Sequence, residues 1–474
     1  MGGGITGLAA AHRCLEASGE RGGPVALTLC EAADRLGGTV GTERVDGFLI
    51  ERGADSFLSD KPGALSLCER LGLGPSLRST DDRFRRVYVV QGGRLVPVPE
   101  GFLLLAPTRL GPVLRSPLFS WSGKARMALD LVLPRRRAGG DESLGAYVRR
   151  RLGRQVLERA VQPLAAGIYT ADPDRLSLAA TMPRFPVIER QHRSVILGLR
   201  RTARAAETTG AAGPRFSLFV TLAGGMGELV DALAAWLPAG TARLGVAATR
   251  VDHGDQAAAW RVRLETGEVL PADGLVLAGP APRMAPLVES LDTRLADRLR
   301  EVSYVSSASV VLAYRRAAVR HPLDAFGYLV PRVERRATIA CTFSSVKYPS
   351  RAPDGFVLLR CYLGGELDRA ILDRDDLELA RLAQADVGDL LGVTGAPVLC
   401  RVRRHRDAMP RYDLGHLDRL VAIDRHLAAL PGLHLVGAAY RGVGIADCIC
   451  AGEEAADRLL GADPDRVCAT SARG

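Results

Sequence analysis

The feature that most constrains the fold is a cluster of glycines at the start of the chain. Gly2, Gly4 and Gly7 fit the pattern GxGxxG, a helix-like run LAAAHRCLEAS follows them, and the apolar segment VALTLCE (25–31) ends in Glu31, 24 residues after Gly7. Glycine turns let backbone N–H groups approach a pyrophosphate at a helix N-terminus, and an acid at the tip of the second strand binds a ribose hydroxyl. The order of turn, helix, strand and acid therefore predicts a dinucleotide-binding unit.

A unit of this kind has a strand in front of its glycine turn. Met1 leaves no room for such a strand in this sequence. We therefore expect the natural chain to begin some residues upstream of Met1. A true truncation, which would weaken cofactor binding, is the alternative.

The segment after Glu31 distinguishes an NAD-type from an FAD-type domain. An NAD-type domain would continue into another helix, whereas RLGG (35–38) is followed here by alternating polar and apolar residues and a second glycine turn, GADS (53–56). An RxGG sequence after the acid resembles the second signature of glutathione-reductase-type flavoproteins, in particular their amine-oxidase-like branch. FAD is therefore the expected cofactor, and a charged hairpin on a different Rossmann enzyme is the alternative.

The other end of the chain carries a second strand, glycine turn and helix. A short apolar strand leads to Gly437, and the turn RGVG (441–444) precedes a helical segment that contains CAGEEAADRLL. The N-terminus of that helix would place N–H groups and a positive dipole end beside the flavin ring, whose reduced form is negative near N1 and the C2 carbonyl. We expect both chain ends to meet at one flavin; an ordinary strand–helix turn is the alternative.

A third flavin-domain segment lies between the two ends. LAGGMGELVDALAAWL (222–237) predicts a helix behind a glycine turn, ARLGVAATRVDH (242–253) predicts a strand, and residues 269–288 predict a hairpin and a returning strand. In such folds the strand that holds Val246 passes the adenine, so its backbone is a candidate contact. The cofactor-binding candidates are Gly2, Gly3, Gly4, Ile5, Thr6, Gly7, Glu31, Ala32, Arg35, Gly37, Gly38, Gly53, Ala54, Asp55, Ser56, Val246, Gly437, Val443, Gly444, Ile445 and Ala446.

The composition argues against nucleic-acid binding, metal binding and a membrane-spanning segment. The net charge is +10, but aromatic residues make up only 5% of the chain and no basic block alternates with them, so no nucleic-acid partner is expected. The nine cysteines form no CxxC pair and the eight histidines no HExxH spacing. We therefore expect no metal site, and reduced, mostly buried thiols in a cytoplasmic protein. The apolar segment at 101–121 is interrupted by prolines and arginines, so it would touch a membrane surface or line a cavity rather than span a bilayer.

Longer motifs resemble one family along nearly the whole chain. The most specific are GIYTADPDRLS (167–177) and YRGVGIADC (440–448), and ERGADSF (51–57) and SWSGKAR (120–126) support them. The chain resembles the oxygen-dependent protoporphyrinogen and coproporphyrinogen oxidases of heme biosynthesis. Within that family it is more similar to the bacterial enzymes that oxidise coproporphyrinogen III. One departure is Ala438, where a polar residue is common after the glycine.

The resemblance implies an α/β and α+β fold with three parts. A glutathione-reductase-type, Rossmann-like FAD-binding domain would comprise residues 1–63, 216–283 and 405–465. A helical domain at 64–215 would shape the substrate tunnel and can meet the membrane, a mixed-sheet substrate domain would cover 284–404, and 466–474 would form a flexible tail. The sequence agrees in outline, because 143–169 has helical periodicity and the segments 306–316 and 355–365 have strand patterns.

The resemblance also implies a reaction. Coproporphyrinogen III would lose six electrons in three hydride transfers to FAD, and dioxygen would reoxidise the flavin with release of hydrogen peroxide. Because aromatisation is strongly downhill, the protein needs only to hold a bridge carbon about 3–3.5 Å from flavin N5 and to shield the intermediates, so no catalytic acid or base is assigned. The alternatives are oxidation of protoporphyrinogen IX, another flavoenzyme such as an amine oxidase or carotenoid desaturase, and a non-catalytic flavin or porphyrin carrier.

Substrate contacts follow from the same resemblance. Four propionates on the ring require cationic anchors, and Lys61, one of three lysines in the chain, stands where the family's coproporphyrinogen enzymes have a substrate-facing lysine; a solvated surface lysine is the alternative. Tyr412 should lie near the flavin, or anchor its loop. Gly167, Ile168 and Tyr169 match the family's substrate-side turn, although Tyr169 could be an ordinary packed aromatic. A transient contact with the downstream enzyme of the heme pathway is also expected.

Overall fold

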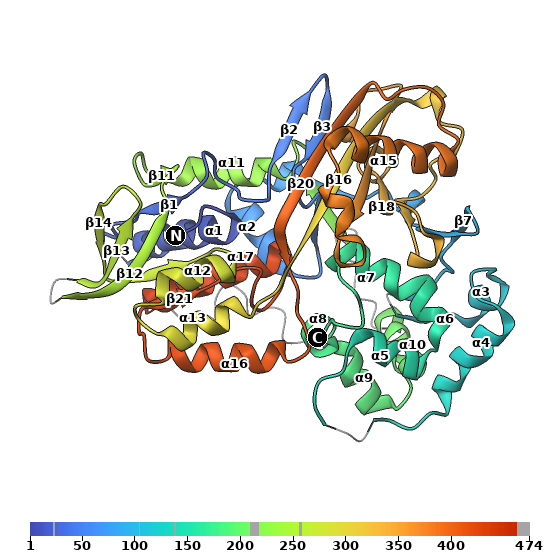
Figure 1. The fold of residues 1–474 in the computed structure, drawn as a ribbon, viewed down its shortest axis with the longest axis horizontal. Helices are drawn as coiled ribbons and strands as arrows, with labels where there is room; N and C mark the ends of the chain where they lie inside the picture. The colour runs from blue at the N-terminus through green and yellow to red at the C-terminus, as the bar shows by residue number, and fades with distance from the viewer. Residues whose placement is uncertain (22–23, 104, 137–138, 209–217, 256–257, 462–474) are drawn as a thin grey trace.

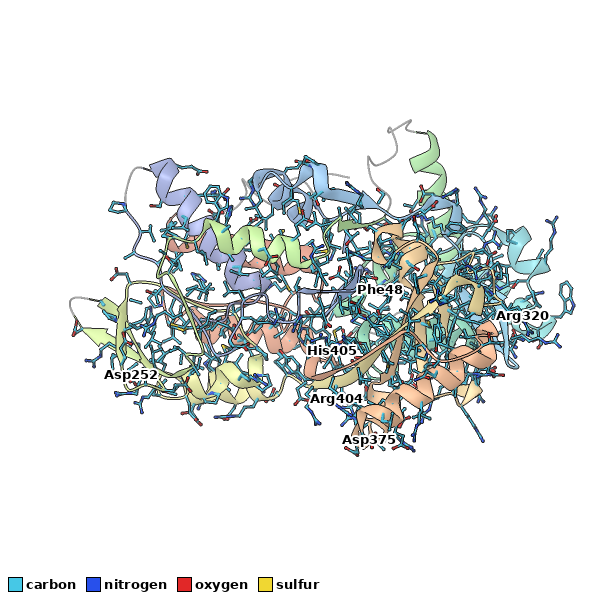
Figure 2. All side chains as sticks on the ribbon, turned by 90° about the horizontal axis from the view of Figure 1, so that it is seen from above. Phe48, Asp252, Arg320, Asp375, Arg404 and His405 are labelled. Atoms are coloured by element: carbon cyan, nitrogen blue, oxygen red, sulfur yellow. The ribbon has the colours of Figure 1, made fainter. Side chains whose placement is uncertain are left out.

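The molecule is elongated, with the predicted flavin-binding part toward one end and the remaining two parts toward the other (Figure 1). The computed structural model describes residues 1–21, 24–103, 105–136, 139–208, 218–255 and 258–461. Asp252 and Arg320 lie toward opposite ends of the long axis in Figure 2, and His405 lies between them. The predicted tail, 466–474, falls outside the described residues.

Two pairs of parallel strands form the centre of the flavin-binding part. β1 (Leu29–Glu31) pairs with β11 (Ala242–Leu244), and β15 (Leu275–Leu277) pairs with β21 (Leu433–Leu435). These strands follow one another in the chain only through helices or long connections, which is the arrangement expected of a Rossmann-like sheet. The predicted α/β character of this part is therefore confirmed.

Met1 and Gly2 lie between the two strand pairs. The Gly2 N–H donates to the Cys30 carbonyl at 2.8 Å on one side. On the other side the Met1 amino group donates to the Val276 carbonyl, and the Ala278 N–H donates to the Met1 carbonyl, each at 2.8 Å. Two residues thus occupy the position where a Rossmann-like sheet has its first strand, directly before the glycine turn.

Helices cover the parallel strands. α1 (Ile5–Arg21) and α17 (Ile445–Leu459) pack along each other, and α11 (Gly227–Trp236) lies beside α1 (Figure 1). A separate layer contains α12 (Ala281–Val288), α13 (Thr293–Arg300) and α16 (His416–Leu427).

An antiparallel sheet of three strands extends the flavin-binding part away from the rest of the molecule. Its strands are β12 (Ala248–Asp255), β13 (Ala258–Leu264) and β14 (Val269–Ala272). The single strand predicted over 242–253 is two strands, because the chain turns at Gly245, whose φ is +65°.

A mixed sheet of seven strands forms the second part, in the order β20-β16-β19-β18-β17-β6-β7. Its three longest strands, β16 (Tyr304–Arg315), β19 (Phe356–Gly364) and β20 (Leu399–Pro410), are antiparallel neighbours. α15 (Asp376–Leu391) covers one face, where Val387 joins the hydrophobic core. The predicted mixed sheet is confirmed.

Two strands at the far edge of this sheet come from an earlier part of the chain. β6 (Tyr88–Gln91) lies parallel to β17 (Gly327–Leu329) and antiparallel to β7 (Arg94–Pro97). β18 (Thr338–Phe343) connects β17 to β19. β6 and β7 lie within the segment 64–215, for which a helical domain is predicted, and the limits of that domain stay a prediction.

The rest of this segment is mainly helical where the structure describes it. The helical pattern at 143–169 forms α5 (Leu144–Arg151), α6 (Arg154–Val156), a π-helical turn and α7 (Gln162–Tyr169), because Gly153 has a φ of 96° that no helix accommodates. None of the described helices has the length and hydropathy needed to cross a bilayer. The other main helices here are α3 (Leu110–Arg115), α4 (Trp121–Ala128), α9 (Arg184–His192) and α10 (Val195–Thr208).

Candidate active site

The predicted pyrophosphate loop is a tight turn between Gly2 and α1, which begins at Ile5. A Cβ atom on Gly7 would overlap the Gly2 carbonyl oxygen, so only glycine fits where the helix crosses the loop. A Cβ on Gly4 would meet no atom within 4 Å, so the turn opens onto free space there. Since the first turn of a helix leaves N–H groups without intrahelical partners, this opening suits an anionic group.

Glu31 holds the glycine turn from the end of β1. The Gly3 N–H donates to its Oε2 at 2.6 Å and the Ala33 N–H donates to its Oε1 at 2.8 Å. The RLGG segment closes on the same turn, because the Gly37 N–H donates to the Gly3 carbonyl at 2.8 Å. Ala32 is exposed beside them. The structure therefore brings the predicted acid and both glycine motifs together.

Arg35 acts on the backbone of its own loop. It donates to the Leu36 carbonyl at 2.8 Å and also binds the Gly38 carbonyl. Burial, and then the charge of Arg52, lower the pKa of Arg35. Gly38 has a φ of +58°, and a Cβ there would lie 3.2 Å from the Gly4 Cα, so a side chain would press on the pyrophosphate turn.

A lysine at the end of α14 (Ser344–Lys347), the short helix between β18 and β19, reaches the GADS turn. The Lys347 Nζ lies 3.0 Å from the Asp55 Oδ1 and 3.3 Å from the Ser56 Oγ. Burial would raise the pKa of Asp55, but the Lys347 charge, the hydrogen bond from Ser56 and the nearby Arg360 outweigh it and lower the pKa to about 2. Asp55 is therefore ionised at neutral pH.

A second cation holds the start of this turn. Arg360 on β19 donates to the Gly53 carbonyl at 2.6 Å, and Ala54 next to it is exposed. Sequence analysis missed Arg360 and Lys347. They lie 307 and 292 residues from their partners and belong to no motif, so only the fold brings them to the GADS turn.

The two chain ends meet along α1 and α17. A Cβ on Gly452 would overlap the Thr6 carbonyl oxygen, and the Arg13 Nε pairs with Asp457 at 2.8 Å, so the helices touch and run in the same direction. Ile445, where α17 begins, precedes Gly452 by seven residues, so α17 extends about 10 Å beyond the start of α1 at 1.5 Å per residue. A dinucleotide with its pyrophosphate at the start of α1 can therefore place its ring at the start of α17.

Tyr412 joins the two sides of the C-terminal turn. Its hydroxyl donates to the Ala438 carbonyl at 2.7 Å and accepts from the Gly442 N–H at 2.9 Å, and its ring stacks on His416 with 4.0 Å between centroids. Gly437 lies beside α1, because a Cβ there would lie 3.7 Å from the Thr6 Oγ1. These bonds are those of a loop anchor, and a substrate contact by Tyr412 stays a prediction. Beyond this turn the chain continues through Val443 and Gly444 into the first residues of α17, Ile445 and Ala446.

The predicted substrate residues approach the start of α17 from two sides. The Lys61 Nζ pairs with both carboxylate oxygens of Asp447, at 2.6 and 2.7 Å. Tyr169 ends α7 and donates to the Thr181 carbonyl at 3.2 Å. Burial, and then the Asp447 charge, raise the pKa of Tyr169 to about 12. The Ile168 side chain is 40% exposed. Gly167 is exposed as well, and a Cβ on it would lie 3.3 Å from the Leu329 Cδ2.

Asp447 is a third functional residue that was not predicted from the sequence. It lies in the motif YRGVGIADC, as the third residue of α17. An acid in the first turn of a helix that begins at a ligand is a recognisable signal, and it could have identified Asp447 before the structure.

Val246 sits at the edge of the parallel strands, beside the end of β1. Its N–H donates to the Glu31 carbonyl at 3.0 Å. The amide is therefore already used within the protein, and the predicted contact of Val246 with an adenine would have to involve other atoms.

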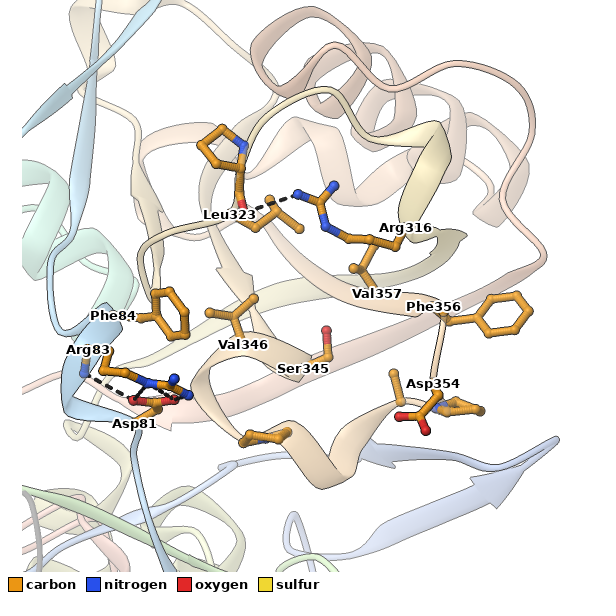
Figure 3. Close-up of a pocket in the computed structure, with 15 residues that line it drawn as sticks. Asp81, Arg83, Phe84, Arg316, Leu323, Ser345, Val346, Asp354, Phe356 and Val357 are labelled. Atoms are coloured by element: carbon orange, nitrogen blue, oxygen red, sulfur yellow. Dashed lines mark hydrogen bonds and ion pairs between the residues drawn. The ribbon is translucent and has the colours of Figure 1, made fainter.

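A cavity of about 290 Å³ is lined by none of the predicted site residues; Phe84, Val346 and Val357 are among those that line it (Figure 3). Arg83 beside it pairs with Asp81, and Arg316 donates to the Val319 carbonyl at 2.7 Å. Both arginines are thus occupied. Within the described ranges, no group of three or more His, Cys, Asp or Glu side chains is placed to hold a metal ion.

Comparisons with known proteins agree with this geometry. The family model for flavin-containing amine oxidoreductases matches residues 5–460. Coproporphyrinogen III oxidase of Bacillus subtilis (strain 168) is 35% identical over 461 residues, and the match covers 97% of each chain. Protoporphyrinogen oxidase of Bos taurus is 33% identical over 494 residues, and the match covers 98% of each chain.

A solved structure from Exiguobacterium sp. 255-15, provisionally named a protoporphyrinogen oxidase, has the same fold. It matches with a TM-score of 0.84 and 30% identity over 97% of each chain. The open turn at Gly4, the Glu31 and RLGG contacts and the paired helix starts fit an FAD. The chain therefore belongs to the flavin-containing amine oxidoreductase family, and FAD is its cofactor.

Proposed function

We propose that the protein oxidises coproporphyrinogen III to coproporphyrin III in heme biosynthesis. The observation that carries the proposal is the meeting of the flavin turns with Lys61 and Tyr169 at the start of α17, in a chain that matches a coproporphyrinogen III oxidase over 97% of both lengths. An oxidation assay on reduced coproporphyrin III, followed by porphyrin fluorescence, tests the proposal.

The protein's own residues position the substrate and shield the intermediates; they do not exchange protons with the substrate. Bound FAD supplies hydride acceptance, with dioxygen as the final oxidant and hydrogen peroxide as the product. The helix starts of α1 and α17 bind negative groups, and Tyr412 fixes the turn between them. Because aromatisation is downhill, a precisely held ring is sufficient, and no acid or base is required.

Protoporphyrinogen IX is the second candidate substrate, supported by the match to the bovine protoporphyrinogen oxidase. It has two propionates where coproporphyrinogen has four. The half-exposed cation Lys61 near the flavin turn favours the ring with more carboxylates. Rates measured side by side on the two rings decide between them.

An amine oxidase and a non-catalytic carrier are the remaining rivals. Turnover of amines without turnover of porphyrinogens would identify the first. Flavin or porphyrin absorbance bands in a protein that oxidises neither ring would identify the second.

We also propose a cytoplasmic protein that touches a membrane from one side. The side chains of Leu114, Trp121, Leu129 and Val132 are all exposed, Trp121 at 73%, and they lie within or just after helices α3 and α4. Lys124 lies 4.5 Å from the Trp121 ring centroid, as suits an interface between headgroups and water. Flotation with anionic vesicles, compared between wild type and Trp121→Ser, tests this contact. The proposal also includes a transient complex with the downstream heme-pathway enzyme.

A further inference from the structure

Lys61 and Asp447 form an ion pair where the flavin turn meets the substrate residues. Lys61 is the N-cap residue of α2 (Pro62–Arg70), and Asp447 lies in the first turn of α17. The side chain of Lys61 is 46% exposed and that of Asp447 is 22% exposed. Solutes can therefore reach both charges, and the pair can be broken without opening the core.

The position of Asp447 is fixed on its other sides. A Cβ on Gly442 would overlap its carboxylate, and one on Gly444 would lie 2.9 Å from its Oδ2, so the two glycines leave room for this side chain over the turn. Tyr169 lies close enough to this carboxylate that, after burial, the Asp447 charge is the second cause of its raised pKa. The carboxylate thus lies between the flavin turn and two predicted substrate residues.

We propose that Asp447 is a specificity-determining residue, which competes with the carboxylates of the substrate for the Lys61 ammonium. This inference rests on the proposed function. A propionate that binds Lys61 has to displace Asp447 or lie beside it. The local net charge is zero with both residues, +1 without the Asp447 carboxylate and −1 without the Lys61 ammonium. A ring with four carboxylates responds to this charge more strongly than a ring with two.

Three variants test how the local net charge affects the binding of coproporphyrinogen III and protoporphyrinogen IX. Asp447→Asn frees the Lys61 ammonium and should lower KM for coproporphyrinogen III about fivefold. Lys61→Met leaves the Asp447 carboxylate without its cation and should raise KM about fivefold. Changes of this size are expected because the pair is partly exposed. The double variant restores zero net charge and should return KM to within about twofold of the wild type. All shifts should be smaller on protoporphyrinogen IX.

A second readout does not depend on turnover. The dissociation constant of coproporphyrin III, from quenching of porphyrin fluorescence, should follow the same order among the variants. The differences should shrink at high salt, because exposed charges are screened. Asp297→Asn is the matched control: Asp297 is an exposed partner of Arg300 on α13, so the same loss of charge there should leave both quantities unchanged.

An ion pair between Lys61 and Asp447 with only a structural role would give a different result. Both single variants would then weaken substrate and product binding, and the double variant would not recover. That pattern would overturn the inference, and so would an Asp447→Asn protein with the KM and product affinity of the wild type. In either case an active wild-type protein would still support the proposed function. A wild type that oxidises neither ring overturns both.

Discussion

Lys347, at the end of α14 beside the mixed sheet, and Asp55 of the flavin-binding part form an ion pair, with 3.0 Å between Nζ and Oδ1 and a sequence separation of 292 residues. The Lys347 side chain is only 12% exposed. Breaking a pair this buried leaves a charge without a partner. The pair therefore fixes the GADS turn and couples the two parts.

Lys347→Met should lower the free energy of unfolding by about 3–5 kcal/mol at pH 7, because the buried Asp55 carboxylate then loses its ion-pair partner and keeps only the hydrogen bond from Ser56. Urea unfolding measures the loss. Glu158→Gln is the control, since the Arg154–Glu158 pair is exposed and should contribute less than about 1 kcal/mol. Equal losses in the two variants would show that the Lys347 pair is no stronger than a surface pair.

The same pair predicts an acid dependence of stability. The pKa of Asp55 is about 2 in the folded protein, below its ordinary value of 3.8, so its contribution is complete above pH 4 and is lost as the pH falls toward 2. The difference corresponds to about 2 kcal/mol. Unfolding free energies between pH 2 and 5 should fall more steeply for the wild type than for Lys347→Met, and parallel curves would contradict the assignment.

Tyr412→Phe should weaken FAD binding about tenfold, because it leaves the Ala438 carbonyl and the Gly442 N–H without a partner in the flavin turn. Titration of apoprotein with FAD measures this. Tyr147→Phe removes one hydroxyl, bonded to the Phe185 carbonyl, from the helical part, and it should lower stability without changing FAD affinity. If both variants bind FAD like the wild type, Tyr412 does not support the turn.

Gly7→Ala should abolish FAD binding, because its Cβ would overlap the Gly2 carbonyl oxygen and push the pyrophosphate turn open. Gly19→Ala in the same helix is the matched control: its Cβ would meet no atom within 4 Å, and it should raise stability by about 0.5–1 kcal/mol. Flavin absorbance after purification separates the two outcomes. A flavin-loaded Gly7→Ala protein would refute the proposed loop geometry.

The flavin-binding turns were predictable because their signals are local. A glycine where a helix crosses a loop, an acid at a strand tip and a helix start each impose a residue type at a fixed spacing. Gly7 lies where α1 crosses the loop, as that spacing requires, and the Glu31 carboxylate accepts from the Gly3 N–H of the same turn. The predicted contact of Glu31 with a ribose hydroxyl stays a prediction. The mixed sheet was expected from the family resemblance, and two of its long strands, β16 and β19, also lie where the segments 306–316 and 355–365 have a strand pattern.

The contacts that complete the site were not predictable in this way. Lys347 and Arg360 reach the GADS turn only because the substrate sheet packs there, and no periodicity encodes a contact across 292 or 307 residues. The break at Gly153 was missed because glycine is tolerated inside a helical pattern, and only its φ of 96° shows that it ends α5.

The decisive experiment is the oxidation of coproporphyrinogen III and protoporphyrinogen IX by the purified, flavin-loaded protein, with porphyrin fluorescence and hydrogen peroxide recorded together. We expect porphyrin and hydrogen peroxide to form together from coproporphyrinogen III, with a higher kcat/KM for this ring, which has four propionates, than for protoporphyrinogen IX. A flavin-loaded protein that oxidises neither ring, or that prefers protoporphyrinogen IX, would contradict this expectation.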